Sequence, residues 1–188
     1  MNIVQFARDI NKLKRLKRTG WVIQKVKQPE SVAEHSFRTA IFAYVLTKPI
    51  KHVNTDKLVK MALVHDLGEI FAGDIPTGLK REKKKGYLEA KHVLEEKAFK
   101  KLLLNIPLAM RKEIYNLWDE YEDQETAEAK WLKDLDKLEM ALQALDYELE
   151  GHDPKKLDQF WEDAQHKIKE PKVLEILKRA LKLRRKEK

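Results

Sequence analysis

Four side chains of the types that bind transition metals stand out in this sequence: His35, the adjacent pair His65 and Asp66, and Asp136. They lie far apart along the chain, but each falls in a segment predicted to be helical. Facing helices can bring such residues together in the core of a bundle, where metal sites are commonly built. Two imidazoles and two carboxylates suit Mn, Co, Fe or Ni better than Mg or Ca. We therefore expect one divalent transition-metal ion per chain.

Two further carboxylates follow the His-Asp pair. Glu69 lies four residues after His65 and three after Asp66, so on a continuous helix all three share one face. A metal ion lowers the pKa of a water molecule that it binds, and Glu69 is positioned to accept a proton from that water as a general base. Asp74 follows in the next loop, where it is a candidate for a second acid or base or for a hydrogen-bond acceptor.

A second His-Asp pair, His152 and Asp153, lies between Gly151 and Pro154. Asp153 there has the pattern of a helix N-cap, followed by proline at the first helical position. We interpret this pair as structural. The other three histidines lie among charged residues and are expected to be solvated: His52, His92 and His166.

Helical periodicity runs through most of the chain, and no segment shows the alternation of a strand. We predict an all-α fold: a single-domain helical bundle over residues 1–188, with a basic C-terminal tail from about residue 178. Ser31 and Glu34 have the pattern of a capping box, and Gly151 is expected to end a long helix. Helices are expected over residues 2–16, 31–48, 87–104 and 125–150, from Asn54 or Thr55 through the segment that carries His65 to Glu69, after Pro107, and from about Pro154 and Pro171, with loops over 18–29 and 73–86.

The composition narrows the possible functions. The 188 residues include no cysteine, which excludes disulfides, zinc–thiolate sites and cysteine nucleophiles. The net charge of +8 comes with abundant Lys and Glu together, as in many heat-adapted proteins, and no nucleic-acid-binding motif accompanies it, so we do not expect general nucleic-acid binding. No segment approaches the roughly 20 apolar residues of a membrane helix. A cytoplasmic protein without membrane contact is expected.

These motifs together resemble the HD superfamily, whose pattern is H…HD…D, and within it the HD-domain 5′-deoxynucleotidases. The resemblance implies hydrolysis of deoxynucleoside 5′-monophosphates to deoxynucleoside and phosphate with a single divalent metal such as cobalt, and it suggests a homodimer. The matching stretches are LKRTGW at residues 16–21, PESVAEH at 29–35, ALVHDLGE at 62–69, GDIPT at 73–77 and LDKLE at 135–139.

By position, the resemblance also assigns roles to individual residues. Arg18 and Trp21 resemble an Arg and a Trp of the family that contact substrate near the sugar, although here Thr19 and Gly20 separate the two. The metal ligands of the family correspond to His35, His65, Asp66 and Asp136, and its catalytic carboxylates to Glu69 and Asp74.

Two other functions stay open at this point. One is hydrolysis of a different nucleotide, either modified or a triphosphate, and the other is non-catalytic binding of nucleotide or RNA. The four ligands together with Glu69 argue against the second, because a binding module needs no general base. Lys80, Arg81 and Lys83–Lys85 in the loop over 73–86 could reach additional phosphates, but we expect them to be solvated. Apolar residues such as Trp118, Tyr121 or Trp161 could supply the face of a dimer.

Overall fold

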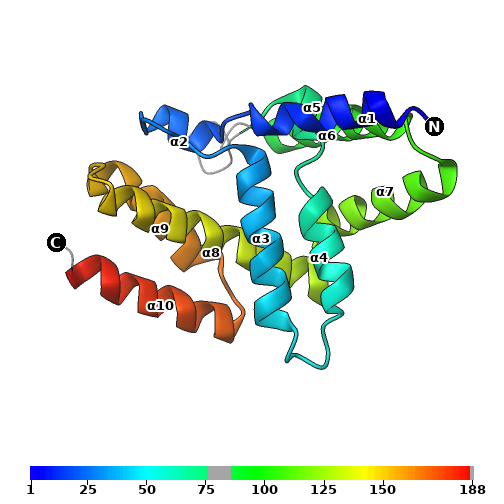
Figure 1. Cartoon of the computed structure of the whole chain (residues 1–188). Helices are drawn as coiled ribbons and strands as arrows, with labels where there is room; N and C mark the ends of the chain where they lie inside the picture. Colours follow the sequence, from blue (N-terminus) through cyan, green and yellow to red (C-terminus); the bar gives the residue numbers. More distant parts are fainter. Residues whose placement is uncertain (76–85, 187–188) are drawn as a thin grey trace.

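The computed structural model describes residues 1–75 and 86–186, and the predicted all-α fold is confirmed. Within these ranges there is no strand, only an isolated antiparallel bridge between Lys17 and Ser31 (Figure 1). No helix in the described part of the chain is long and apolar enough to cross a membrane. The elements are α1 (Ile3–Ile10), the 3-10 helix η1 (Asn11–Lys14), α2 (Thr19–Ile23), α3 (Val32–Thr47), α4 (Thr55–Val64), α5 (Glu69–Ala72), α6 (Tyr87–Leu103), α7 (Leu108–Asp123), α8 (Ala127–Leu149), α9 (Pro154–Lys167) and α10 (Pro171–Lys186).

The long helix α8 is the centre of the bundle. It packs against α3, α4, α7, α9 and α10, and α3 and α4 lie side by side across it (Figure 1). Its apolar residues recur every three or four positions, so that Leu132, Leu135, Leu138 and Ala141 are all at most 1% exposed. Any side chain on this inner face of α8 is therefore held in the interior.

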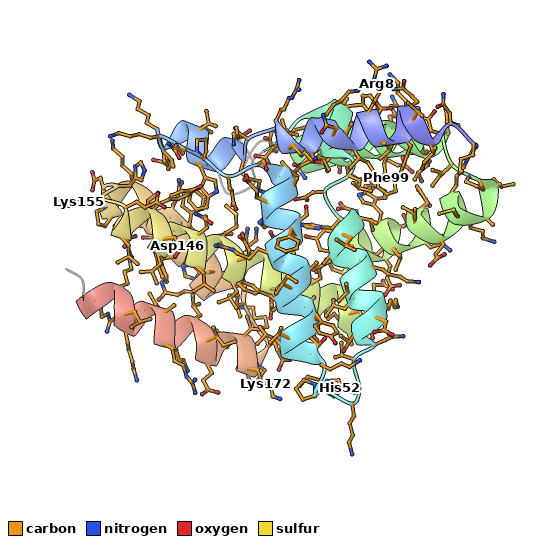
Figure 2. The ribbon with its side chains drawn as sticks, viewed as in Figure 1. Arg8, His52, Phe99, Asp146, Lys155 and Lys172 are labelled. Atoms are coloured by element: carbon orange, nitrogen blue, oxygen red, sulfur yellow. The ribbon has the colours of Figure 1, made fainter. Side chains whose placement is uncertain are left out.

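A second apolar core joins α1, η1 and α5 to α6 and α7. Phe99 on α6 stacks on Trp118 of α7 with ring centroids 5.2 Å apart, while Arg8 on α1 points outward (Figure 2). Trp118, Tyr121 and Trp161 are only 1%, 6% and 1% exposed, so the suggestion that they supply a dimer face is wrong. These large rings fill the interior of the protein itself.

Several helix ends follow the predicted chemistry. The Ser31 hydroxyl accepts a hydrogen bond from the Glu34 amide (3.2 Å), and Glu34 accepts one from the Ser31 amide (2.6 Å), which confirms the capping box of α3. Asp153 caps α9 by accepting from the Lys155 amide at 3.0 Å. Gly151 follows α8 with φ +93°, a conformation that favours glycine.

Other boundaries differ from the predictions. The helix expected over residues 2–16 changes to 3-10 geometry after Ile10, and the loop expected over 18–29 contains α2. The basic residues from 178 onward continue α10 to Lys186. Of the loop expected over 73–86, residues 76–85, including the basic cluster from Lys80 to Lys85, lie outside the described residues.

The continuous helix expected to carry both His65 and Glu69 is wrong. α4 ends at Val64, and turns with i to i+3 hydrogen bonds lead to α5, for example from the Glu69 amide to the Asp66 carbonyl at 3.1 Å. The local cause is Gly68, where an added Cβ would lie 3.1 Å from the Glu95 carbonyl oxygen of α6. Gly68 both weakens the helix and lets α6 approach closely.

Candidate metal centre and active site

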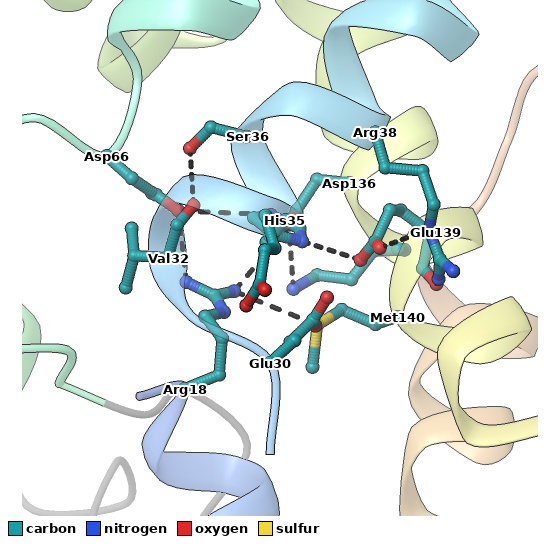
Figure 3. Close-up of polar contacts among 12 residues, drawn as sticks. Arg18, Glu30, Val32, His35, Ser36, Arg38, Asp66, Asp136, Glu139 and Met140 are labelled. Carbon is teal, nitrogen blue, oxygen red and sulfur yellow. Dashed lines mark hydrogen bonds and ion pairs between the residues drawn. The ribbon is translucent and has the colours of Figure 1, made fainter. Parts of the chain in front are cut away.

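The structure brings His35, His65 and Asp66 together from two neighbouring helices. His35 lies in the first turn of α3, His65 caps the C-terminus of α4, and Asp66 begins the turn that follows. Asp66 Oδ2 lies 3.8 Å from His35 Nε2 (Figure 3). The same oxygen lies 3.3 Å from His65 Nε2. One ligand atom from each of the three residues lies within 4.8 Å of the others, which is close enough for one metal ion.

The two imidazoles are oriented as metal ligands are. His35 Nδ1 is 2.5 Å from Glu139 Oε2, and His65 Nδ1 is 2.7 Å from the Ala62 carbonyl oxygen. Each of these contacts fixes one ring nitrogen and turns Nε2 toward the centre, where neither Nε2 has a hydrogen-bond partner among the described residues. Buried, unpaired imidazole nitrogens beside a carboxylate fit a divalent metal ion well.

Asp136, the fourth predicted ligand, lies at the edge of this group. Its Oδ1 is 3.1 Å from His35 Nε2, while its Oδ2 is 3.1 Å from Lys137 Nζ. It does not belong to the cluster within 4.8 Å that unites the other three residues. Asp136 faces the centre from α8, on the side of His35 (Figure 3).

Arg18 points into the centre of the site. Its Nη1 donates to Asp66 Oδ2 and Asp74 Oδ1, both at 3.0 Å, and lies 3.5 Å from Glu69 Oε1. Its Nη2 lies 4.0 Å from Asp136 Oδ1. The guanidinium therefore neutralises carboxylates from several segments of the chain. We expected Arg18 to contact the substrate, and here it occupies the centre of the site.

The electrostatics of the site follow from this crowding. Burial raises the pKa of Asp66 and Asp136, but nearby cations outweigh it and hold both below their usual range: chiefly His65 and Arg18 for Asp66, and Lys137 for Asp136. Burial and Arg18 act against a charged His35, yet Glu139 and Asp136 raise the pKa of His35 to about 10. A bound metal would take the place of that proton, because a ligating imidazole must be neutral.

Glu69 has the environment of a strong base. It is the first residue of α5 and only 5% exposed, and its Oε2 has no hydrogen-bond partner among the described residues. Burial, Asp66 and Asp74 raise the pKa of Glu69 well above its usual range. A carboxyl group with a raised pKa accepts a proton from water more readily than an ordinary one.

Asp74 holds the start of α2 against the site. Its Oδ2 accepts a hydrogen bond from the Thr19 amide, and its backbone carbonyl accepts one from the Thr19 hydroxyl at 2.7 Å. Its Oδ1 accepts a hydrogen bond from Arg18 Nη1. The carboxylate also lines the cavity described below. Of the roles that we considered, these contacts favour that of a hydrogen-bond acceptor.

Trp21 lies behind the site rather than in it. Its side chain is 0% exposed, donates from Nε1 to Glu30 Oε1 at 2.9 Å, and packs on Phe160 with ring centroids 3.9 Å apart. Phe160 and Gly20, unlike Trp21, line the cavity, and a Cβ on Gly20 would come within 3.1 Å of the Phe160 ring. Trp21 therefore does not line the cavity, and Phe160 forms its aromatic surface there.

Glu139 is a buried site residue that the sequence motifs did not single out. Glu139 is 0% exposed and also accepts from Arg38 Nε at 2.6 Å, so it joins His35 to a cation on the same helix (Figure 3). Its position three residues after Asp136 in a helix was a usable signal, because residues at that spacing lie on one face. Nearby, burial and Glu139 raise the pKa of Glu30 to about 7.

A cavity of about 490 Å³ opens beside the candidate metal ligands. His92, which we expected to be solvated, has a side chain that is 45% exposed and also lines this cavity. It stacks on Trp118 with ring centroids 5.4 Å apart and lies 3.3 Å from Glu122. Neither His152 nor Asp153 lines the cavity. Its charged walls also include Lys91, Lys133 and Lys137.

Comparison with known proteins agrees with this geometry. The family model described as "HD domain" matches residues 10–176. The chain is 41% identical to the human protein named 5′-deoxynucleotidase HDDC2 over 94% of this chain and 83% of that protein, and 43% identical to the zebrafish (Danio rerio) protein of that name over 94% and 85%.

Solved structures agree as well. A conserved hypothetical protein from Pyrococcus furiosus has a TM-score of 0.76 and 34% identity over 95% of this chain and 99% of that chain. A protein from Magnetospirillum magnetotacticum, described as a predicted metal-dependent phosphohydrolase, has a TM-score of 0.71 and 26% identity over 96% and 90%. The fold, the arrangement of histidines and aspartates, and these matches lead to one conclusion: the chain belongs to the HD domain family.

Proposed function

We propose that this protein is a metal-dependent 5′-deoxynucleotidase, which hydrolyses deoxynucleoside 5′-monophosphates to deoxynucleoside and phosphate. The observation that carries the proposal is the convergence of the Nε2 atoms of His35 and His65 on Asp66, beside buried Glu69. The adjoining cavity of about 490 Å³ is within the usual range for a small-molecule site. Relatives named 5′-deoxynucleotidase, 41% and 43% identical, support the choice of substrate.

In this proposal His35, His65, Asp66 and Asp136 hold one divalent transition-metal ion, with Co, Mn, Fe or Ni as the candidates. The ion would act as a Lewis acid that lowers the pKa of water and offsets the charge of the phosphate. Glu69 accepts the proton of the attacking water. Its raised pKa and its position on the cavity wall support this role.

Arg18 and Asp74 act as a linked pair that positions substrate in this proposal. Asp74 holds Arg18 and the start of α2 in place, and both residues line the cavity. Trp21 contributes to recognition of the sugar from behind, because it packs on Phe160, which can contact the ligand. The spacing between Arg18 and Trp21 is consistent with this arrangement, since it allows Gly20 to lie against Phe160.

The test is a phosphate-release assay. Metal-stripped protein is supplied separately with Co, Mn, Fe, Ni and Mg and given deoxy- and ribonucleoside 5′-monophosphates, 3′-monophosphates and triphosphates. We expect turnover with transition metals and preference for deoxynucleoside 5′-monophosphates. Turnover confined to triphosphates would assign a different nucleotide substrate, and nucleotide or RNA binding without any phosphate release would favour the non-catalytic alternative.

The general base is tested by Glu69→Gln. The variant should retain metal and bind nucleotide, while turnover falls by roughly 10² to 10⁴, the usual contribution of a positioned base. Glu113→Gln is the matched control, because the Glu113 side chain is 58% exposed and lies outside this cavity. Unchanged turnover in Glu69→Gln would remove Glu69 from the mechanism.

We also propose that the protein is a homodimer. Phe37, Ile41, Tyr44 and Val45 form an apolar stripe along α3, and they are 65%, 45%, 50% and 60% exposed. Their spacing places them on one face of the helix, which supports burial against a second copy. Light scattering should give a dimer for the native chain and a monomer for Phe37→Glu. The cytoplasmic location stays a prediction, to be tested by cell fractionation.

A further inference from the structure

Most cationic side chains that line the cavity already have anionic partners. Arg18 contacts Asp66 and Asp74 at 3.0 Å, and Lys91 contacts Glu95 at 2.8 Å. Lys137 lies 3.1 Å from Asp136 and 3.7 Å from Asp163. The charges of these three side chains are therefore compensated within the chain itself.

Lys133 is different. Its half-buried side chain lines the same cavity, and its Nζ lies 5.3 Å from the centre of the Tyr121 ring. Among the residues that the structure describes, Lys133 has no carboxylate within ion-pair distance and no hydrogen-bond acceptor. Burial and nearby Lys137 lower the pKa of Lys133. A cation in such a place weakens the fold unless an anion reaches it.

The position of Lys133 relative to the metal centre limits what that anion can be. Lys133 lies three residues before Asp136 on α8, so the two side chains project from one face of the helix, about 5–6 Å apart at Cβ. Tyr121, over which the ammonium lies, contacts His65 edge-on at 5.3 Å between ring centres. A group that reaches both the metal centre and Lys133 must therefore lie at the point where the cavity meets Asp136.

We propose that Lys133 binds the phosphate of the nucleotide substrate. This inference rests on the proposed function, because it assigns one end of that substrate to one residue. A phosphate monoester carries a charge of about −1.5 to −2 at neutral pH, and lysine is a common partner for it. The sugar and base are neutral and would leave the charge of Lys133 uncompensated. Arg18 is less suited to this role, because its donors are already engaged by Asp66 and Asp74.

The experiment measures binding separately from turnover. Isothermal titration gives the Kd of inorganic phosphate, of a deoxynucleoside 5′-monophosphate and of the matching deoxynucleoside, with metal-loaded and metal-stripped protein; the monophosphate is titrated into Glu69→Gln protein to prevent hydrolysis. The variants are Lys133→Met, which keeps the length of the side chain, and Lys133→Arg, which keeps the charge. Lys130→Met is the control, because Lys130 is an exposed lysine on the same helix.

In Lys133→Met, phosphate and monophosphate should bind roughly tenfold to a hundredfold more weakly, the usual effect of losing a hydrogen bond between charged groups. Binding of the deoxynucleoside should not change, Lys133→Arg should restore much of the affinity, and Lys130→Met should match the native protein. The Tm of Lys133→Met should equal or exceed the native value, because an uncompensated buried charge is removed.

Unchanged phosphate binding in Lys133→Met would overturn the inference. An equal loss of deoxynucleoside binding, or a lowered Tm, would also overturn it, because Lys133 would then shape the cavity rather than bind phosphate. These readouts do not depend on catalysis. If the native protein binds phosphate through Lys133 but hydrolyses no nucleotide, the proposed function fails while the assignment of Lys133 stands.

Discussion

Replacing Glu139 by glutamine tests how the protein orients a metal ligand. Glu139 is 0% exposed, and its two carboxylate oxygens serve two donors: His35 Nδ1 at 2.5 Å and Arg38 Nε at 2.6 Å. Glutamine has nearly the same volume but offers one acceptor oxygen and an NH₂ group that only donates. In Glu139→Gln, either His35 or Arg38 must therefore lose its partner.

The size of the effect follows from these contacts. Loss of one hydrogen bond between charged groups costs about 1.5–3 kcal/mol. Arg38 keeps two other acceptors, Asp146 Oδ2 and the Glu139 carbonyl, both at 3.1 Å. The loss is therefore limited to one hydrogen bond, and we expect the free energy of unfolding to fall by about 2 kcal/mol. For metal binding, loss of an outer partner of a ligating histidine lowers affinity by roughly 10–100-fold.

The assay is a competitive metal titration with Co²⁺ or Mn²⁺, together with denaturant unfolding of metal-stripped protein. Asp146→Asn is the matched control, because it removes an Arg38 partner that is 52% exposed and should cost no more than about 1 kcal/mol with unchanged metal affinity. If Glu139→Gln binds metal as tightly as the native protein, then either His35 is not a ligand or its orientation does not depend on Nδ1.

Five shorter predictions follow from the same geometry. His65→Ala should lose both metal and turnover, whereas His152→Ala should keep native kinetics. The opposite pattern would show that the site contains the second His-Asp pair and not the first. Asp153→Ala should lower the free energy of unfolding by about 1 kcal/mol, measured with urea, through loss of a helix cap, with turnover unchanged. Phe160→Ala should raise the KM of deoxynucleotides, because it removes the aromatic wall of the cavity, and an unchanged KM would place the sugar elsewhere. Since the pKa of His35 is about 10 rather than 6.5, the metal association constant should rise with pH by up to about tenfold per unit below pH 10. By the same shift, His35 stabilises metal-stripped protein fully below pH 6.5, and this contribution is lost as the pH rises through about 10.

Sequence patterns predicted the features that are determined locally. The capping box at Ser31, the N-cap at Asp153 and the glycine after α8 depend on short-range chemistry, and all three are confirmed. Residue types also predicted that His35, His65 and Asp66 belong to one group, and the structure brings these three side chains together.

Features that depend on long-range packing were not predictable in this way. The end of α4 before His65 depends on the approach of α6 to Gly68, and the position of His92 on the cavity wall depends on its stacking against Trp118. Trp21 looked like a residue that contacts the ligand, but its indole is covered by Tyr147 and Phe160. Neighbours that are distant in sequence decide each of these cases.

The insertion of Arg18 among the carboxylates has a consequence for how the protein matures. Acidic groups gathered at a metal centre repel one another until a cation arrives, and many small metalloproteins therefore fold only with their metal. Here a guanidinium within the chain contacts Asp66 and Asp74 at 3.0 Å and lies near Glu69 and Asp136, so the repulsion is relieved by the polypeptide itself. The carboxylates therefore do not need an ion to relieve their repulsion, and an ion that binds there would compete with the contacts of a single arginine.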